Sequence, residues 1–183
     1  MLIASMSLST DGFINDRDGG IAWAPPSDEL FEFHLDRVRT LGGHIIGRRL
    51  YETMLVWETD PSLRSVPTFA AFADVWTALP KVVFSHRPVE LLGNARLATA
   101  PLADEIVAML AGTDVNVEIG GAVLAGQAFE LGLIDDLHLF RAPIVLGGGT
   151  PFFPPGSPKT QLELVETRTF DPGVIFEHYR VSR

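Results

Sequence analysis

Short apolar runs alternate with amphipathic stretches through the first two thirds of the chain. The runs are bounded by Gly, Ser, Asp or Pro, which is typical of buried strands. They cover residues 2–8, 44–46, 81–84 and 115–119. The stretches between them are predicted to be helices, and they cover residues 28–41, 48–54, 68–79, 102–110 and 122–131. This order predicts a sheet covered by helices, with residues 2–8 as the central strand.

The helix predicted at residues 28–41 has clear start and stop signals. Its apolar residues, from Leu30 to Leu41, fall on one side of a helical wheel. Ser27 can cap the first turn, and the two prolines before it prevent an earlier start. The pair Gly42-Gly43 is expected to end this helix.

The pattern changes after Gly132. Residues 137–146, 162–169 and 174–181 look like strands with no long helix between them. The sheet is therefore expected to finish in antiparallel strands, which places the chain in the α/β class with a mixed, mainly parallel sheet. No repeat or linker divides the chain, so we expect one domain over residues 1–183.

Composition narrows the functional classes. The chain has no cysteine, which excludes a disulfide scaffold, thiolate metal sites and a catalytic thiol. A net charge of −9 disfavours general binding to nucleic acid. No apolar run approaches the length of a membrane span, and no basic residue precedes the first apolar run, so we expect a cytoplasmic protein rather than a secreted or membrane protein. The five histidines form no His-x-x-x-His pair, so no metal site is expected, and His138 and His178 are expected to be structural.

Three short stretches that follow predicted strands are candidates for binding an anion. They are Gly47-Arg48-Arg49, Ser85-His86-Arg87 and Gly120-Gly121-Ala122. Ligands of open α/β sheets lie beyond the carboxyl ends of the strands, and a helix that starts there offers free N–H groups to phosphate. Glycines allow close approach of the backbone, and arginines provide cationic forks. Each stretch alone could equally be a tight turn with solvated arginines.

The same stretches carry a family resemblance that covers nearly the whole chain. The matching segments are SLSTDGFI, GRRLYE, KVVFS and VEIGGAVLAGQAFELGLIDDLHLFRAPIVLGGGTPFF. With them the chain resembles the dihydrofolate reductase-like superfamily, and within it the C-terminal reductase domain of the riboflavin-biosynthesis protein RibD. The resemblance implies a three-layer fold with a sheet of about eight strands, flanking helices and an antiparallel C-terminal hairpin. No deaminase domain is expected, because the chain lacks the cysteines of a zinc deaminase.

The resemblance also implies a function and a cofactor. It implies an NADPH-dependent reductase of a small heterocycle, similar to 5-amino-6-(5-phosphoribosylamino)uracil reductase, working as a homodimer. Dihydrofolate reductase is the alternative, and a nucleotide-binding or scaffold protein without turnover is a second one. The implied cofactor-binding residues are Gly47, Arg48, Arg49, Ser85, His86, Arg87, Gly120, Gly121, Ala122 and Val123.

The substrate end of the site is expected at the start of the first helix. Trp23-Ala24-Pro25-Pro26-Ser27-Asp28 matches the WxxPxD pattern that places a carboxylate in the pterin pocket of dihydrofolate reductases. The resemblance therefore implies that Asp28 assists protonation of the substrate. The alternative is that Asp28 only stabilises the helix N-terminus. Trp23, Phe31 and Trp57 are candidates to wall a flat heterocycle, although Phe31 on its apolar face also suits the core.

Overall fold

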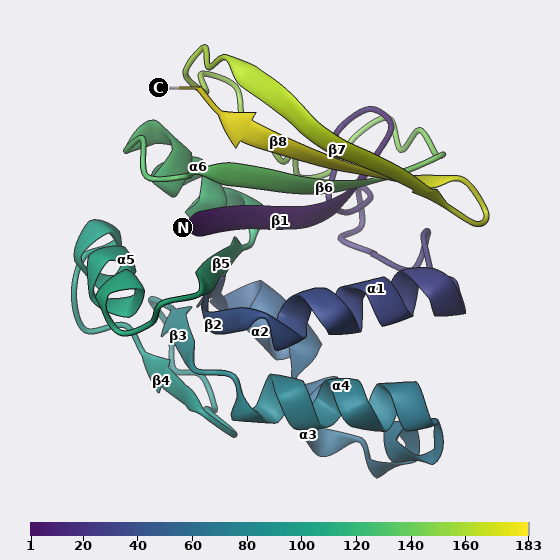
Figure 1. Ribbon diagram of the computed structural model, residues 1–183, viewed down its shortest axis with the longest axis vertical. Helices are drawn as coiled ribbons and strands as arrows, with labels where there is room; N and C mark the ends of the chain where they lie inside the picture. Colours follow the sequence, from purple (N-terminus) through teal and green to yellow (C-terminus); the bar gives the residue numbers. More distant parts are fainter. Residues whose placement is uncertain (183) are drawn as a thin grey trace.

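The computed structural model describes residues 1–182, which form one eight-stranded sheet with helices on both faces (Figure 1). The strands are β1 (Leu2–Ser9), β2 (Leu41–Gly47), β3 (Lys81–Phe84), β4 (Ala95–Leu97), β5 (Asn116–Gly120), β6 (Asp136–Ala142), β7 (Leu162–Phe170) and β8 (Val174–Val181). The α-helices are α1 (Asp28–Arg39), α2 (Arg48–Met54), α3 (Val56–Thr59), α4 (Pro67–Ala78), α5 (Leu102–Ala111) and α6 (Ala122–Glu130), and η1 (Pro61–Ser65) is a 3₁₀ helix.

The strand order is β4-β3-β2-β5-β1-β6-β8-β7. The first six strands are parallel, and β8 and β7 are antiparallel to their neighbours. The predicted α/β class, the mixed sheet and the antiparallel C-terminal hairpin are therefore confirmed. β1 lies inside the sheet, between β5 and β6, as the apolar sequence of this strand predicts.

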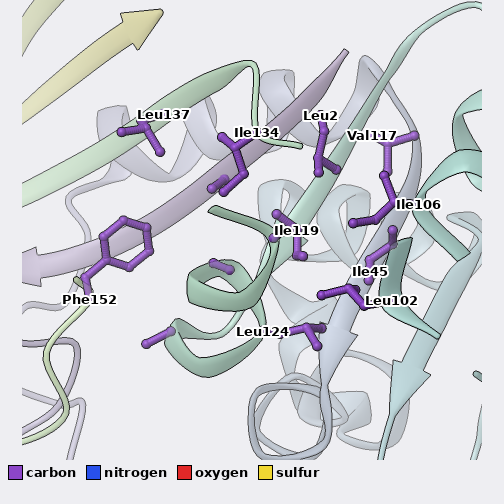
Figure 2. Close-up of a cluster of buried hydrophobic side chains, with 14 of the residues drawn as sticks. Leu2, Ile45, Leu102, Ile106, Val117, Ile119, Leu124, Ile134, Leu137 and Phe152 are labelled. Carbon is purple, nitrogen blue, oxygen red and sulfur yellow. The ribbon is translucent and has the colours of Figure 1, made fainter. Parts of the chain in front are cut away.

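Alternating side chains on the strands form the two helix-covered faces of the sheet. Ile45 and Val82 belong to the core under α5 and α6. Figure 2 shows Ile45 in this core, together with Leu102 and Leu124. Ile46 and Val83 pack on the opposite face with α1 and α4. This alternation follows from the two-residue period of a strand and explains why the central strands are apolar throughout. Among residues 1–182, no helix is long and apolar enough for a membrane crossing.

Helix α1 starts where the sequence predicts and ends earlier. The side-chain oxygen of Ser27 accepts a hydrogen bond from the N–H of Leu30, which makes Ser27 the N-cap. The glycines expected to stop the helix instead lie within β2. A Cβ added to Gly42 would collide with Thr113, and one added to Gly43 would lie 2.6 Å from the sulfur of Met109 at the end of α5. The two glycines are therefore needed because β2 packs closely against Met109 and Thr113, and they do not act as a helix stop.

The structure also differs from the sequence prediction in one strand end, a 3₁₀ helix and a short edge strand. β6 ends at Ala142, before Pro143, and does not continue to residue 146. The segment between the helices predicted at residues 48–54 and 68–79 contains η1. The three-residue strand β4 gives too short a pattern to be recognised in the sequence, and it adds the edge of the sheet beside β3.

Two half-buried histidines make the stability of the fold sensitive to acid. Burial, together with the nearby positive charge of Arg37, lowers the pKa of His34 and of His138 from 6.5 to about 3. Between these values the unfolded chain binds protons that the folded chain does not, so stability is present above pH 6.5 and is lost as the pH falls towards 3. We expect each histidine to add up to about 1.4 kcal/mol per pH unit to the loss of unfolding free energy over this range.

Urea unfolding of the wild-type protein and of His34→Gln across this pH range tests the expectation. His34 packs on the ring of Phe140, so glutamine keeps much of its volume and removes the titration. The variant should show a shallower loss of stability with acid. Parallel curves for the two proteins would contradict the role of His34.

Candidate functional site

The three predicted anion-binding stretches meet at one edge of the sheet. They follow β3, β2 and β5, which are neighbouring parallel strands, so their carboxyl ends lie side by side (Figure 1). The register pairs Gly47 with Phe84, and Ile46 with Gly120. Stretches that are more than thirty residues apart in the sequence therefore form one continuous rim.

The centre of this rim is made of backbone. Gly121 is the N-cap of α6 and has φ +95°, a conformation that residues with side chains rarely adopt. A Cβ added to Gly121 would lie 3.9 Å from the backbone nitrogen of Gly47, the N-cap of α2. Neither helix has a side-chain cap, so the N–H groups of their first turns remain available to a ligand. Ala122, at the start of α6, is buried, and Val123 is exposed.

Gly120 is required for packing beneath the rim. A Cβ at this position would lie 2.8 Å from the Nε2 atom of His44 and 2.8 Å from a methyl group of Leu50. His44 is buried and neither of its ring nitrogens has a hydrogen-bond partner among the described residues. Burial lowers its pKa, so the ring is neutral beneath the rim. Nothing in the apolar run of β2 marks this histidine as a neighbour of the double glycine.

Cationic side chains surround the backbone rim. Arg48 is half-buried and its guanidinium contacts the carboxylate of Glu52 at 2.9 Å. Arg49, His86 and Arg87 are exposed. The Ser85 hydroxyl donates to the carbonyl of Arg87 at 2.6 Å and accepts from its N–H, which shapes the turn after β3. The chain therefore gathers three arginines at an edge where its backbone N–H groups are also free.

The predicted substrate residues fall into two groups on either side of α1. Phe31 and Trp57 are in contact, with ring centroids 5.5 Å apart, in an aromatic cluster with Phe69 and Phe72. Trp23 packs in a different cluster, and its ring N–H donates to the carbonyl of Gly20. The aromatic side chains predicted for one pocket therefore do not form a single wall.

Asp28 occupies the first position of α1 and is exposed. The capping role belongs to Ser27, while the neighbouring Glu29 is paired with Arg168 of β7 at 2.7 Å. Within residues 1–182 the Asp28 carboxylate has no hydrogen-bond or ion-pair partner, which leaves it available to solvent or a ligand. Both roles predicted for Asp28 therefore stay open.

A loop contact missed by the sequence reasoning joins the ends of β1 and β6. The carboxylate of Asp11 accepts hydrogen bonds from the Ser9 hydroxyl and from the N–H groups of Leu146 and Gly147. These hydrogen bonds, led by that from Ser9, lower the pKa of Asp11 to about 2. Asp11 lies within the SLSTDGFI stretch, and its position in a turn-like sequence is the signal that could have identified it. It fixes the loop after β1 beside the strand ends that form the site.

Comparison with known structures defines the class of fold. The structure matches dihydrofolate reductase from Enterococcus faecalis with a TM-score of 0.64 at 19% identity, covering 100% of this chain and 97% of that one. A proposed riboflavin biosynthesis protein from Shewanella sp. PV-4 matches with a TM-score of 0.79 at 22% identity, covering 100% and 99% of the two chains. The fold is therefore dihydrofolate reductase-like.

The family follows from the sequence. Residues 1–176 match the model of the RibD C-terminal domain, so the chain belongs to this family. It is also similar to the uncharacterised protein YyaP of Bacillus subtilis, with 26% identity over 177 residues that cover 95% of this chain and 91% of that protein. The resemblance drawn from the motifs is thereby confirmed.

Proposed function

We propose that the protein is an NADPH-dependent reductase of a small heterocyclic substrate, of the type of 5-amino-6-(5-phosphoribosylamino)uracil reductase. The observation that carries this proposal is the rim at the carboxyl ends of β3, β2 and β5, where glycine backbone and arginines meet. Membership of the RibD C-terminal family supports the reaction class. The homodimer expected from the resemblance stays a prediction.

The charge distribution supports a phosphorylated cofactor at this rim. The chain has a net charge of −9, so an anion must be held by a local cluster of cations rather than by the overall field. Arg48 and the turn from Ser85 to Arg87 would contact the adenosine 2′-phosphate, and Gly120-Gly121 would approach the pyrophosphate. The Enterococcus faecalis enzyme with the same fold was solved with NADP(H).

The chain's own residues would orient the reactants and supply a proton. NADPH provides the hydride when it is bound. The free N–H groups at the start of α6 would fix the phosphates, and the turns after β2 and β3 would hold the adenosine end. Asp28, exposed at the start of α1, would hold a proton for the substrate atom that becomes negative.

Turnover assays test the reaction and separate it from the alternative. NADPH oxidation should be measured with the ribosylaminopyrimidine substrate of the proposed reaction and, separately, with dihydrofolate. Oxidation with the aminopyrimidine supports the proposal, whereas oxidation with dihydrofolate alone would favour dihydrofolate reductase. Saturable NADPH binding with no acceptor in either assay would favour a binding protein without turnover.

The Asp28→Asn variant should lower turnover by roughly 100-fold while NADPH affinity stays largely unchanged, because a general acid contributes to the chemical step. Glu32→Gln is the matched control, since Glu32 is an exposed acid on the same helix. Turnover of Asp28→Asn equal to that of the control across the pH range would remove Asp28 from the mechanism and leave it as a helix-terminus residue.

A further inference from the structure

A cluster of three potential metal ligands lies at the opposite edge of the sheet from the cofactor rim. Asp136 and His138 project from the same face near the start of β6, and His178 is the direct cross-strand partner of His138 on β8. One nitrogen or oxygen atom from each residue lies within 4.8 Å of the other two. Asp136 is 2% exposed and the histidines are half-buried.

Two side-chain atoms of these residues are buried without a hydrogen-bond partner among the described residues. They are Nε2 of His138 and Oδ1 of Asp136. The other carboxylate oxygen, Oδ2, contacts Nε2 of His178 at 2.8 Å. Buried polar atoms are nearly always hydrogen-bonded, so two buried atoms without a hydrogen bond in one small cluster call for a physical explanation. Oδ1 of Asp136 has only a longer ion-pair contact, at 3.5 Å from Nε of Arg180.

We propose that Asp136, His138 and His178 bind a divalent transition metal ion of the Zn²⁺ class. Two imidazole nitrogens and one carboxylate oxygen suit zinc and its neighbours, whereas Mg²⁺ and Ca²⁺ prefer ligand sets made of oxygen. Ligands of one tetrahedral zinc ion lie roughly 3.4 Å apart, so side-chain movements of about an ångström close the cluster around an ion.

Arg37 competes with metal binding because it holds the ring of His138 in the tautomer that cannot bind a metal through Nε2. Its guanidinium donates to Nδ1 of His138, with distances of 3.2 Å from Nε and 2.9 Å from Nη2. A neutral ring that accepts at Nδ1 carries its proton on Nε2, the atom that would bind the metal. Binding therefore requires Arg37 to release Nδ1 and the proton to move there. Arg37 has other partners when it does so, since Nη2 also contacts Glu118 at 2.7 Å and Ser5 at 3.2 Å.

An open groove of about 320 Å³ gives an ion access to the cluster. All three candidate ligands line it, together with the rings of Phe33 and Phe176 and the side chain of Arg180. Nε of Arg180 lies 3.5 Å from Oδ1 of Asp136, and its half-exposed side chain can move into solvent as the ion enters. Three protein ligands beside a groove leave a coordination position for water or a small ligand.

The proposal departs from the sequence prediction, which expected no metal site and a structural role for His138 and His178. Asp136 and His138 are two residues apart, whereas His178 comes from another strand, forty residues further along the chain. The cross-strand pairing that joins them is a property of the folded sheet. The site is independent of the proposed reductase function, because it lies at the amino-terminal ends of the parallel strands.

Titration of the purified protein with Co²⁺ and with Zn²⁺ tests the proposal. Co²⁺ should develop the visible absorption of a site with nitrogen ligands, and Zn²⁺ should displace it with one ion bound per chain. His138→Gln and His178→Gln should each weaken Zn²⁺ binding by at least the roughly 10- to 100-fold that loss of an outer-shell partner costs. His86→Gln is the matched control, since His86 is an exposed histidine beyond the opposite edge of the sheet.

Substitution of Arg37 gives a result that a purely structural cluster would not give. Arg37→Gln with Glu118→Gln removes the ion pair as a unit and frees Nδ1 of His138, so the double variant should bind Zn²⁺ more tightly than the wild-type protein. Thermal unfolding without metal verifies that each variant is folded. Failure of the folded wild-type protein and the folded double variant to bind either ion would overturn the proposal. Equal affinity in the wild-type protein and both histidine variants would also overturn it, because the ion would then bind elsewhere.

Discussion

Arg48→Ala is expected to weaken NADPH binding by roughly 10- to 100-fold, the cost of losing a charge-assisted hydrogen bond, and to change NADH binding much less. The difference arises because only NADPH carries the 2′-phosphate that the guanidinium would contact. Arg48 is suited to this contact because it is half-buried at the start of α2, directly after the backbone of Gly47. Its pairing with Glu52 orients the side chain, and the exposed pair contributes little stability of its own.

Arg39→Ala is the control for loss of a surface ion pair. Arg39 contacts Asp36 at 2.9 Å three residues away on its helix, and it lies at the end of α1 rather than at a carboxyl end of the strands. This variant should bind both cofactors like the wild-type protein. An equal loss of NADPH and NADH affinity in Arg48→Ala would show that Arg48 does not read the 2′-phosphate.

Gly121→Ala is expected to reduce the affinity for NADPH and for NADH alike, by more than roughly tenfold, which corresponds to about 1.4 kcal/mol. A Cβ has space at this position, since the nearest atom would be 3.9 Å away. The cost comes from the backbone, because φ +95° is unfavourable for alanine by about 1–3 kcal/mol. Relaxation of this strain would turn the N–H groups at the start of α6 away from the pyrophosphate that both cofactors share.

Gly132→Ala is the control that distinguishes the effect of backbone strain on stability from an effect on cofactor binding. Gly132 also has a positive φ, +67°, with nothing within 4 Å of an added Cβ, and it follows the other end of α6. Both variants should lose stability in urea unfolding, whereas only Gly121→Ala should lose affinity for the cofactors. Unchanged affinity in a folded Gly121→Ala protein would remove the double glycine from the binding site.

The sequence predicted the fold well where each strand or helix carries its own signal. Residues 81–84 and 174–181 are strands at the predicted bounds, because short apolar runs between turns need little tertiary information. Prediction failed where a neighbour decides the structure. Gly42-Gly43 looks like a helix stop, yet these glycines belong to β2 because Met109 and Thr113 pack against them.

The sequence identified those parts of the candidate site that have a local signal and missed those that depend on contacts between distant residues. The three stretches were identified because each follows a predicted strand, and the strand order of the folded sheet then places the ends of β3, β2 and β5 side by side. His44 beneath Gly120 and the contact of Asp11 with Gly147 depend on side-chain positions in three dimensions. The arrangement of the aromatic candidates also depends on the fold, since Trp23 and Phe31 pack in two different clusters, and their role at the substrate stays a prediction.

The most direct test of the central claim is a titration of the wild-type protein with NADPH and, separately, with NADH, followed by quenching of tryptophan fluorescence. The proposed rim predicts saturable binding of NADPH with clear preference over NADH, because arginines at the ends of β2 and β3 would bind the additional phosphate. Absence of saturable binding of either cofactor would contradict the claim and would mean that this dihydrofolate reductase-like fold serves another function.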